Sequence, residues 1–134
     1  MDKTDPVRDF LRERGCSEQV VEGGLADLVK TWGQVVDTVK RGYLLTLDDY
    51  LNDLDGRQLL KEVLRVAPKG EKEKYMERIQ RADEKMRTLV KPIGKCLWGA
   101  EVAEAEGWTP KKDWWYFSRP LKGDPDFLAE IDEV

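Results

Sequence analysis

The most informative absence is that of histidine, since the 134 residues contain none. Ser-His-Asp and Cys-His nucleophile pairs need an imidazole base, and ordinary catalytic zinc sites, two-His-carboxylate iron sites and Glu-x-x-His di-iron sites need imidazole ligands, so these classes of enzyme site are excluded. A pH switch built on histidine is excluded as well. Any catalysis would therefore have to depend on carboxylates with a hard cation, or on a single thiol.

Cysteines and long apolar runs are also scarce. The two cysteines, Cys16 and Cys96, lie far apart and form no Cys-x-x-Cys motif, which predicts free thiols in a reducing compartment and no thiolate metal site. We interpret Cys16 as a small, partly buried residue after the turn at Gly15, with a reactive thiol as the alternative. No apolar run approaches the roughly 20 residues needed to cross a bilayer, or a signal sequence. We therefore expect a soluble, cytoplasmic protein with no membrane partner.

Charge is abundant and unevenly distributed. Charged residues make up 37% of the chain and the net charge is −4, with a pI of about 5.0. Residues 1–56 carry 7 basic and 12 acidic side chains, residues 57–95 carry 12 and 6, and residues 96–134 carry 4 and 9. We interpret these blocks as facing one another or water within one domain. The alternative is that part of the basic segment faces an anionic partner.

Apolar residues recur at helical spacing through most of the chain, which predicts an all-α fold: a compact bundle of two long and several short helices. The long helices are expected at Leu25–Arg41 and Glu71–Leu97, packed antiparallel. The segment 47–66 should lie between them, broken near Asp55 and Gly56 where the apolar phase slips. The core should contain Leu28, Trp32, Val35, Leu51, Leu60, Ile79, Met86 and Leu89.

A single domain is expected over residues 1–134, with the bundle at about 5–98. The remaining residues, 99–134, should form a short helix at Ala100–Glu106, an irregular aromatic arm and a last short helix. Only the stretch Trp114–Ser118 offers a possible strand.

The aromatic arm, residues 108–122, is the strongest candidate for a binding surface. It holds three of the five tryptophans beside several cations, and aromatic faces next to cations hold protein partners and single-stranded nucleic acids. The alternative is that these aromatics fasten the arm to the core. The predicted partner-binding residues are Trp108, Lys111, Lys112, Trp114, Trp115, Tyr116 and Arg119.

Two pairs of acidic residues are weaker candidates for a metal site. Asp49 and Asp53 lie one helical turn apart, and Glu101 and Glu104 form a Glu-x-x-Glu pair of the kind that holds magnesium in small all-helical nucleotide pyrophosphohydrolases. A second acidic motif of that kind is absent. We interpret all four as helix-capping or solvated side chains and predict no metal site and no cofactor.

Because no catalytic set is complete, the sequence favours a small non-enzymatic interaction or adaptor protein that binds a protein partner through the aromatic arm. Nucleic-acid binding through residues 57–95 and the same aromatics is the first alternative, and the low pI argues against it. The second alternative is a magnesium-dependent nucleotide phosphohydrolase that uses the clustered carboxylates.

Overall fold

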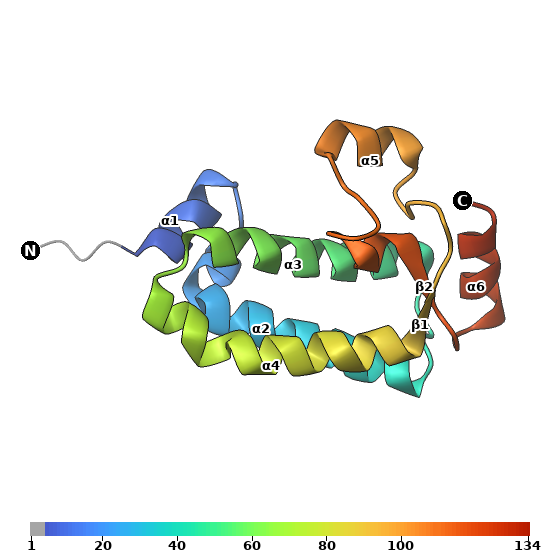
Figure 1. The fold of residues 1–134 in the computed structure, drawn as a ribbon, viewed down its shortest axis with the longest axis horizontal. Helices are drawn as coiled ribbons and strands as arrows, with labels where there is room; N and C mark the ends of the chain where they lie inside the picture. The colour runs from blue at the N-terminus through green and yellow to red at the C-terminus, as the bar shows by residue number, and fades with distance from the viewer. Residues whose placement is uncertain (1–4) are drawn as a thin grey trace, which may run out of the picture.

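Helices dominate the structure, a computed structural model that describes residues 5–134, and this confirms the all-α prediction. Helices α1 (Pro6–Glu13), α2 (Glu18–Arg41), α3 (Leu47–Val66) and α4 (Lys69–Leu89) occupy the first two-thirds of the chain. Figure 1 shows α2, α3 and α4 side by side, with α1 across one end and the later elements toward the other. No helix within residues 5–134 combines the length and the apolarity needed to span a membrane.

Local capping signals explain where these helices begin. The Asp5 side chain accepts a hydrogen bond from the backbone N–H of Arg8, and Ser17 caps α2 in the same way. Thr46 and Asp49 form a complete capping box at the start of α3. Side chains at these positions satisfy backbone donors that the first helical turn leaves without partners.

The predicted helix at Leu25–Arg41 is present, but a further helical segment at residues 18–23 precedes it, so that α2 consists of two helical segments. The two segments meet at Gly24, whose φ of 57° and ψ of −153° lie outside the helical region. Only glycine adopts this conformation without strain. The chain therefore changes direction at Gly24 without losing the helix that precedes it.

The long helices α2 and α4 run parallel, and the antiparallel prediction was wrong. Trp32 of α2 hydrogen-bonds Asp83 of α4, and further along both helices Asp37 pairs with Lys85. The reason is the length of α3, which spans the bundle between two short connections. Three successive helices joined by short turns alternate in direction, so the first and third run the same way.

Helix α3 continues through Gly56 without the predicted break. Glycine inside a helix costs only about 1 kcal/mol relative to alanine, which the packing of Leu54 and Leu60 on either side outweighs. Helix α4 ends at Leu89 and not at Leu97, because Val90–Pro92 forms strand β1. Strand β1 pairs antiparallel with β2 (Ser118–Pro120).

The last third of the chain, which includes the aromatic arm, lies toward one end of the bundle (Figure 1). It contains α5 (Ala100–Glu106), the 3-10 helix η1 (Trp114–Phe117) and α6 (Pro125–Asp132). The possible strand at Trp114–Ser118 is thus a 3-10 turn that leads into β2. Of the predicted core residues, Leu28 and Leu89 are only partly buried. The other six are buried: Trp32, Val35, Leu51, Leu60, Ile79 and Met86.

Candidate functional site

A buried aspartate fastens the aromatic arm to the bundle. One oxygen of Asp113 lies 2.5 Å from the Nζ atom of Lys61 on α3, and the other accepts the backbone N–H of Thr109. The Asp113 side chain is 2% exposed and that of Lys61 is 24% exposed. This shielded, charge-assisted hydrogen bond and the backbone contact together join the turn before η1 to α3.

Two of the predicted partner-binding residues, Trp115 and Tyr116, lie in the core. The Trp115 ring packs against the guanidinium of Arg57, with 4.2 Å from Cζ to the ring centroid. The hydroxyl of Tyr116 donates to Asp55 at 2.6 Å, and burial together with this carboxylate raises the pKa of the phenol. These two side chains therefore hold the arm on the bundle and present no surface to a partner.

The buried side of the aromatic arm, where Trp115 lies, covers a polar cluster between α2, α3 and α4. Arg57 makes two hydrogen bonds to Asp83, at 3.0 and 2.8 Å, and Trp32 donates its Nε1 proton to the same carboxylate at 2.8 Å. Arg57 is 7% exposed. Since buried charges are tolerated only when paired and hydrogen-bonded, this cluster belongs to the structural core.

The opposite side of η1 carries two aromatics that remain near the surface. Side chains three residues apart in a 3-10 helix point the same way, so Trp114 and Phe117 lie together. Both line a pocket of about 260 Å³. The guanidinium of Arg87, at the end of α4, lies 4.3 Å from the centroid of the Trp114 ring. The other lining residues are Val90, Pro92, Pro110 and Ser118.

The predicted cations of the arm separate into two groups. Lys111 and Lys112 are exposed on the turn that leads into Trp114. Arg119 is largely covered, donates to the carbonyl of Pro120 and lies 3.9 Å from Asp132 of α6. The arm therefore offers Lys111 and Lys112 beside the Trp114 pocket, while Arg119 helps to hold α6.

Trp108, the first aromatic of the arm, belongs to a different surface. Its ring stacks on that of Tyr116, with centroids 4.0 Å apart and planes 13° from parallel. Trp108 and Tyr116 line a groove of about 440 Å³ between α3 and the α5 region, together with Trp98 and several carboxylates. This groove shares no lining residue with the Trp114 pocket.

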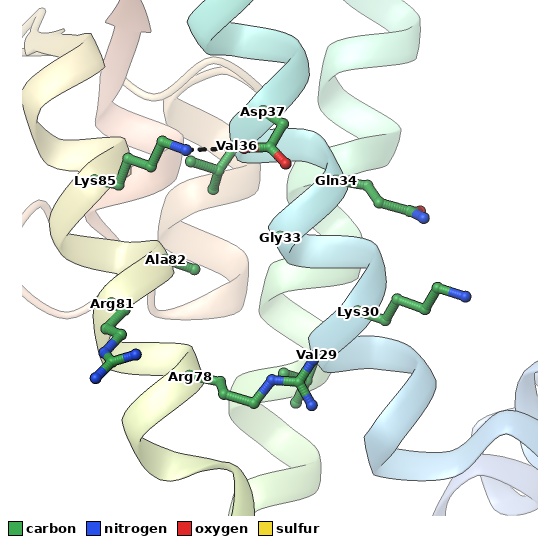
Figure 2. A pocket seen from close by; sticks show the side chains of 10 residues that line it. All are labelled: Val29, Lys30, Gly33, Gln34, Val36, Asp37, Arg78, Arg81, Ala82 and Lys85. Carbon is green, nitrogen blue, oxygen red and sulfur yellow. Dashed lines mark hydrogen bonds and ion pairs between the residues drawn. The ribbon is translucent and has the colours of Figure 1, made fainter.

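The basic middle of the chain contributes to a third hollow, of about 330 Å³, between α2 and α4. Figure 2 shows Lys85 reaching across it to Asp37, while Arg78 extends toward Val29. The ion pair lowers the pKa of Asp37, through its hydrogen bond with Lys85 first and the charge of Lys85 second. Glu77 pairs with Arg81 on α4. Two of the cations are thus compensated within the fold.

The four metal-ligand candidates do not converge. Asp49 is part of the capping box of α3, and Asp53 accepts a hydrogen bond from the hydroxyl of Tyr43 at 2.6 Å. Burial raises the pKa of Asp53, while that hydrogen bond acts to lower it. Glu101 and Glu104 lie exposed on α5. Within residues 5–134, no three acidic or cysteine side chains are grouped to hold a metal ion.

Sequence reasoning missed Arg87 and Trp98, and it did not assign Arg57 a place in the core. One signal was present, because the apolar stripe of Leu54 slips and polar residues take up its positions in the second half of α3. Arg57 and Lys61, one turn apart, are the residues that meet the arm. A charged residue within an apolar stripe can thus indicate a position where a later segment of the chain packs and contributes a residue of opposite charge.

These features describe a small helical protein whose aromatic arm lines two separate surface hollows, while a third lies between α2 and α4. Comparison of the chain with family models, with curated proteins and with solved structures gives no match.

Proposed function

We propose that this protein is a small non-enzymatic interaction module that binds an apolar segment of a partner protein in the pocket beside Trp114. The observation that carries the proposal is the half-buried Trp114 ring, stacked under Arg87 and joined by Phe117 in one pocket. Tryptophan and arginine dominate the binding energy of protein interfaces when they line a pocket of this kind. The anchoring of the arm by Asp113 lowers the entropy lost on binding.

The surrounding charge favours a partner with acidic residues next to its apolar segment. Lys111 and Lys112 precede the pocket in the chain, and Lys91 follows Val90 at its wall. Opposite charge around an apolar centre increases the rate of association and selects the partner. The use of cysteine in this chain leads us to place this interaction in the cytoplasm.

Selection from a displayed library of random peptides tests this proposal. We expect enrichment of peptides with an aromatic or aliphatic anchor flanked by Asp or Glu. Trp114→Ala should weaken a selected peptide at least about tenfold, the loss of one good hot spot. Trp98→Ala is the matched control, since it removes a half-exposed tryptophan from another surface. Peptides that bind both variants as they bind the unmodified protein would overturn the proposal.

The hollow between α2 and α4 favours one alternative, the binding of a nucleic acid. Arg78 and Lys30 line it (Figure 2). Helix α4 leads on from there to Arg87, whose guanidinium lies over the Trp114 ring. A fluorescent single-stranded oligonucleotide titrated at two salt concentrations tests it. Nucleic-acid binding requires an affinity that falls steeply with salt and a loss on Arg78→Ala. Salt-independent binding, or none at low salt, eliminates this alternative.

A further inference from the structure

The groove between α3 and α5 has an aromatic lining that the Trp114 pocket does not share. Trp98 is 40% exposed and stands at one wall. Trp108, stacked on Tyr116, forms another. The two tryptophan rings line about 440 Å³, which is room for a small organic group, and the buried Tyr116 ring supports Trp108 from below.

Carboxylates dominate the charge of the same groove. Asp55, Glu62 and Glu106 line it, and Arg14 is the one cation among its lining residues. Arg14 is already paired with Glu62 at 2.5 Å. The lining thus carries two negative charges in excess, so an anionic ligand is repelled from it.

One of these carboxylates, Asp55, also holds the aromatic lining in place. One oxygen of Asp55 accepts from both Trp98 Nε1, at 3.0 Å, and the Tyr116 hydroxyl, at 2.6 Å, which fixes two of the aromatic rings around it. A neutral apolar ligand would take water away from the groove carboxylates and leave their charge without compensation, whereas a cation would pair with that charge.

We propose that this groove binds an alkylammonium group, carried by a methylated lysine side chain or by a small quaternary amine. Tryptophan faces attract such cations through their ring quadrupole, and nearby carboxylates add a direct charge interaction. The alkyl groups occupy the apolar walls, while the positive charge lies near Asp55 and Glu106. The site is independent of the Trp114 pocket and does not rest on the function proposed for it.

Isothermal titration calorimetry with choline and with 3,3-dimethylbutanol provides the first test. The second compound has the shape of choline but a carbon in place of the charged nitrogen. We expect saturable binding of choline. The neutral compound should bind at least about tenfold more weakly than choline, which is the difference that a desolvated cation–π contact provides. N-acetyl-trimethyllysine amide is the second probe. Tighter binding of this probe than of choline assigns the groove to a protein side chain, and the reverse assigns it to a free amine.

Three variants locate the site. Trp98→Ala should weaken the binding of choline about tenfold or more, and Trp98→Phe should restore much of it because a ring face returns. Glu106→Gln, at an exposed position, should weaken binding about two- to fivefold. Trp114→Ala is the control and should leave choline binding unchanged.

Three results would overturn the proposal. The first is the absence of saturable heat with both choline and the trimethyllysine probe, from protein whose circular dichroism is unchanged. The second is binding of 3,3-dimethylbutanol as tight as that of choline. The third is a loss of choline binding on Trp114→Ala as large as that on Trp98→Ala.

Discussion

Neutralising Asp83 should destabilise the protein more than any change to a surface charge. Asp83 accepts two hydrogen bonds from Arg57 and one from Trp32, and so ties α2, α3 and α4 together through one carboxylate. The substitution Asp83→Asn keeps the shape of the side chain and an acceptor for Trp32. It removes the charge that compensates the buried guanidinium.

The magnitude follows from the burial of the pair. The Arg57 and Asp83 side chains are 8% and 20% exposed, so water replaces the lost partner poorly. Removing one member of such a pair costs about 3–5 kcal/mol, because the other charge stays buried without compensation. A domain of this size has about 5–15 kcal/mol of stability in total, so a large share of it should be lost. The Trp115 ring beside Arg57 recovers only part of this cost.

Urea unfolding followed by far-UV circular dichroism measures this change, and a double-mutant cycle isolates its cause. Arg57→Met should cost a similar amount, since it leaves the Asp83 carboxylate with Trp32 alone. The double variant Arg57→Met and Asp83→Asn buries no net charge, so its loss should be smaller than the sum of the two by about 2 kcal/mol or more. Glu77→Gln, in an exposed ion pair on α4, should stay within about 0.5 kcal/mol.

Additive losses would refute this reasoning. If the double variant loses the sum of the two single effects to within about 0.5 kcal/mol, Arg57 and Asp83 do not act as a pair. A loss below about 1 kcal/mol for Asp83→Asn would show that water reaches the guanidinium after all.

The remaining predictions concern single positions. In urea unfolding, Gly24→Ala should cost about 1–3 kcal/mol because its φ of 57° and ψ of −153° suit only glycine, while Gly56→Ala inside α3 should gain about 0.5–1 kcal/mol. Burial raises the pKa of Asp53, so the native state binds the proton of this carboxyl group more tightly than the unfolded state does. The native state therefore loses stability as the pH rises from the pKa of the unfolded state through the raised native pKa. Asp53→Asn should therefore be stabilising in urea unfolding at pH 7, by a margin that shrinks toward pH 4. Ellman's reagent should modify Cys16 in the native protein and reach Cys96 only on unfolding, because burial shields that thiol and raises its pKa.

Local signals in the sequence predicted most of the helices correctly. The caps at Ser17 and Thr46 depend on side chains within one turn of the backbone that they satisfy, so they can be read without the tertiary fold. The directions of α2 and α4 could not be read in this way. They depend on whether α3 runs unbroken past Gly56, which packing decides and propensity does not.

The aromatic arm shows a second limit of prediction from sequence, which concerns the side chains that reach the surface. An extended arm would place alternate side chains on the same side, and the four aromatics from Trp114 to Phe117 would then divide differently. The 3-10 turn of η1 pairs Trp114 with Phe117 at the surface and sends Trp115 and Tyr116 inward. The Lys61–Asp113 ion pair just before this turn joins residues 52 positions apart in the chain, and no local pattern predicts such a contact. Composition could therefore identify the segment but not which of its rings a partner can reach.

Asp55 explains why sequence analysis did not find the proposed ammonium groove. It is also a poor position for testing the groove, because its replacement would disturb the aromatic rings around it. Read locally, Asp55 before Gly56 predicts a helix cap, yet in the fold it lies inside α3 and accepts from Trp98 and Tyr116. Replacing Asp55 would loosen the rings that it orients, so a loss of binding there could reflect either lost charge or lost shape. Glu106 supplies charge to the same groove without orienting an aromatic wall, and Trp98→Phe keeps a wall without its N–H donor. If Glu106→Gln weakens choline binding while Trp98→Phe largely preserves it, charge and ring face are the recognised features, and the Asp55 hydrogen bonds only position them.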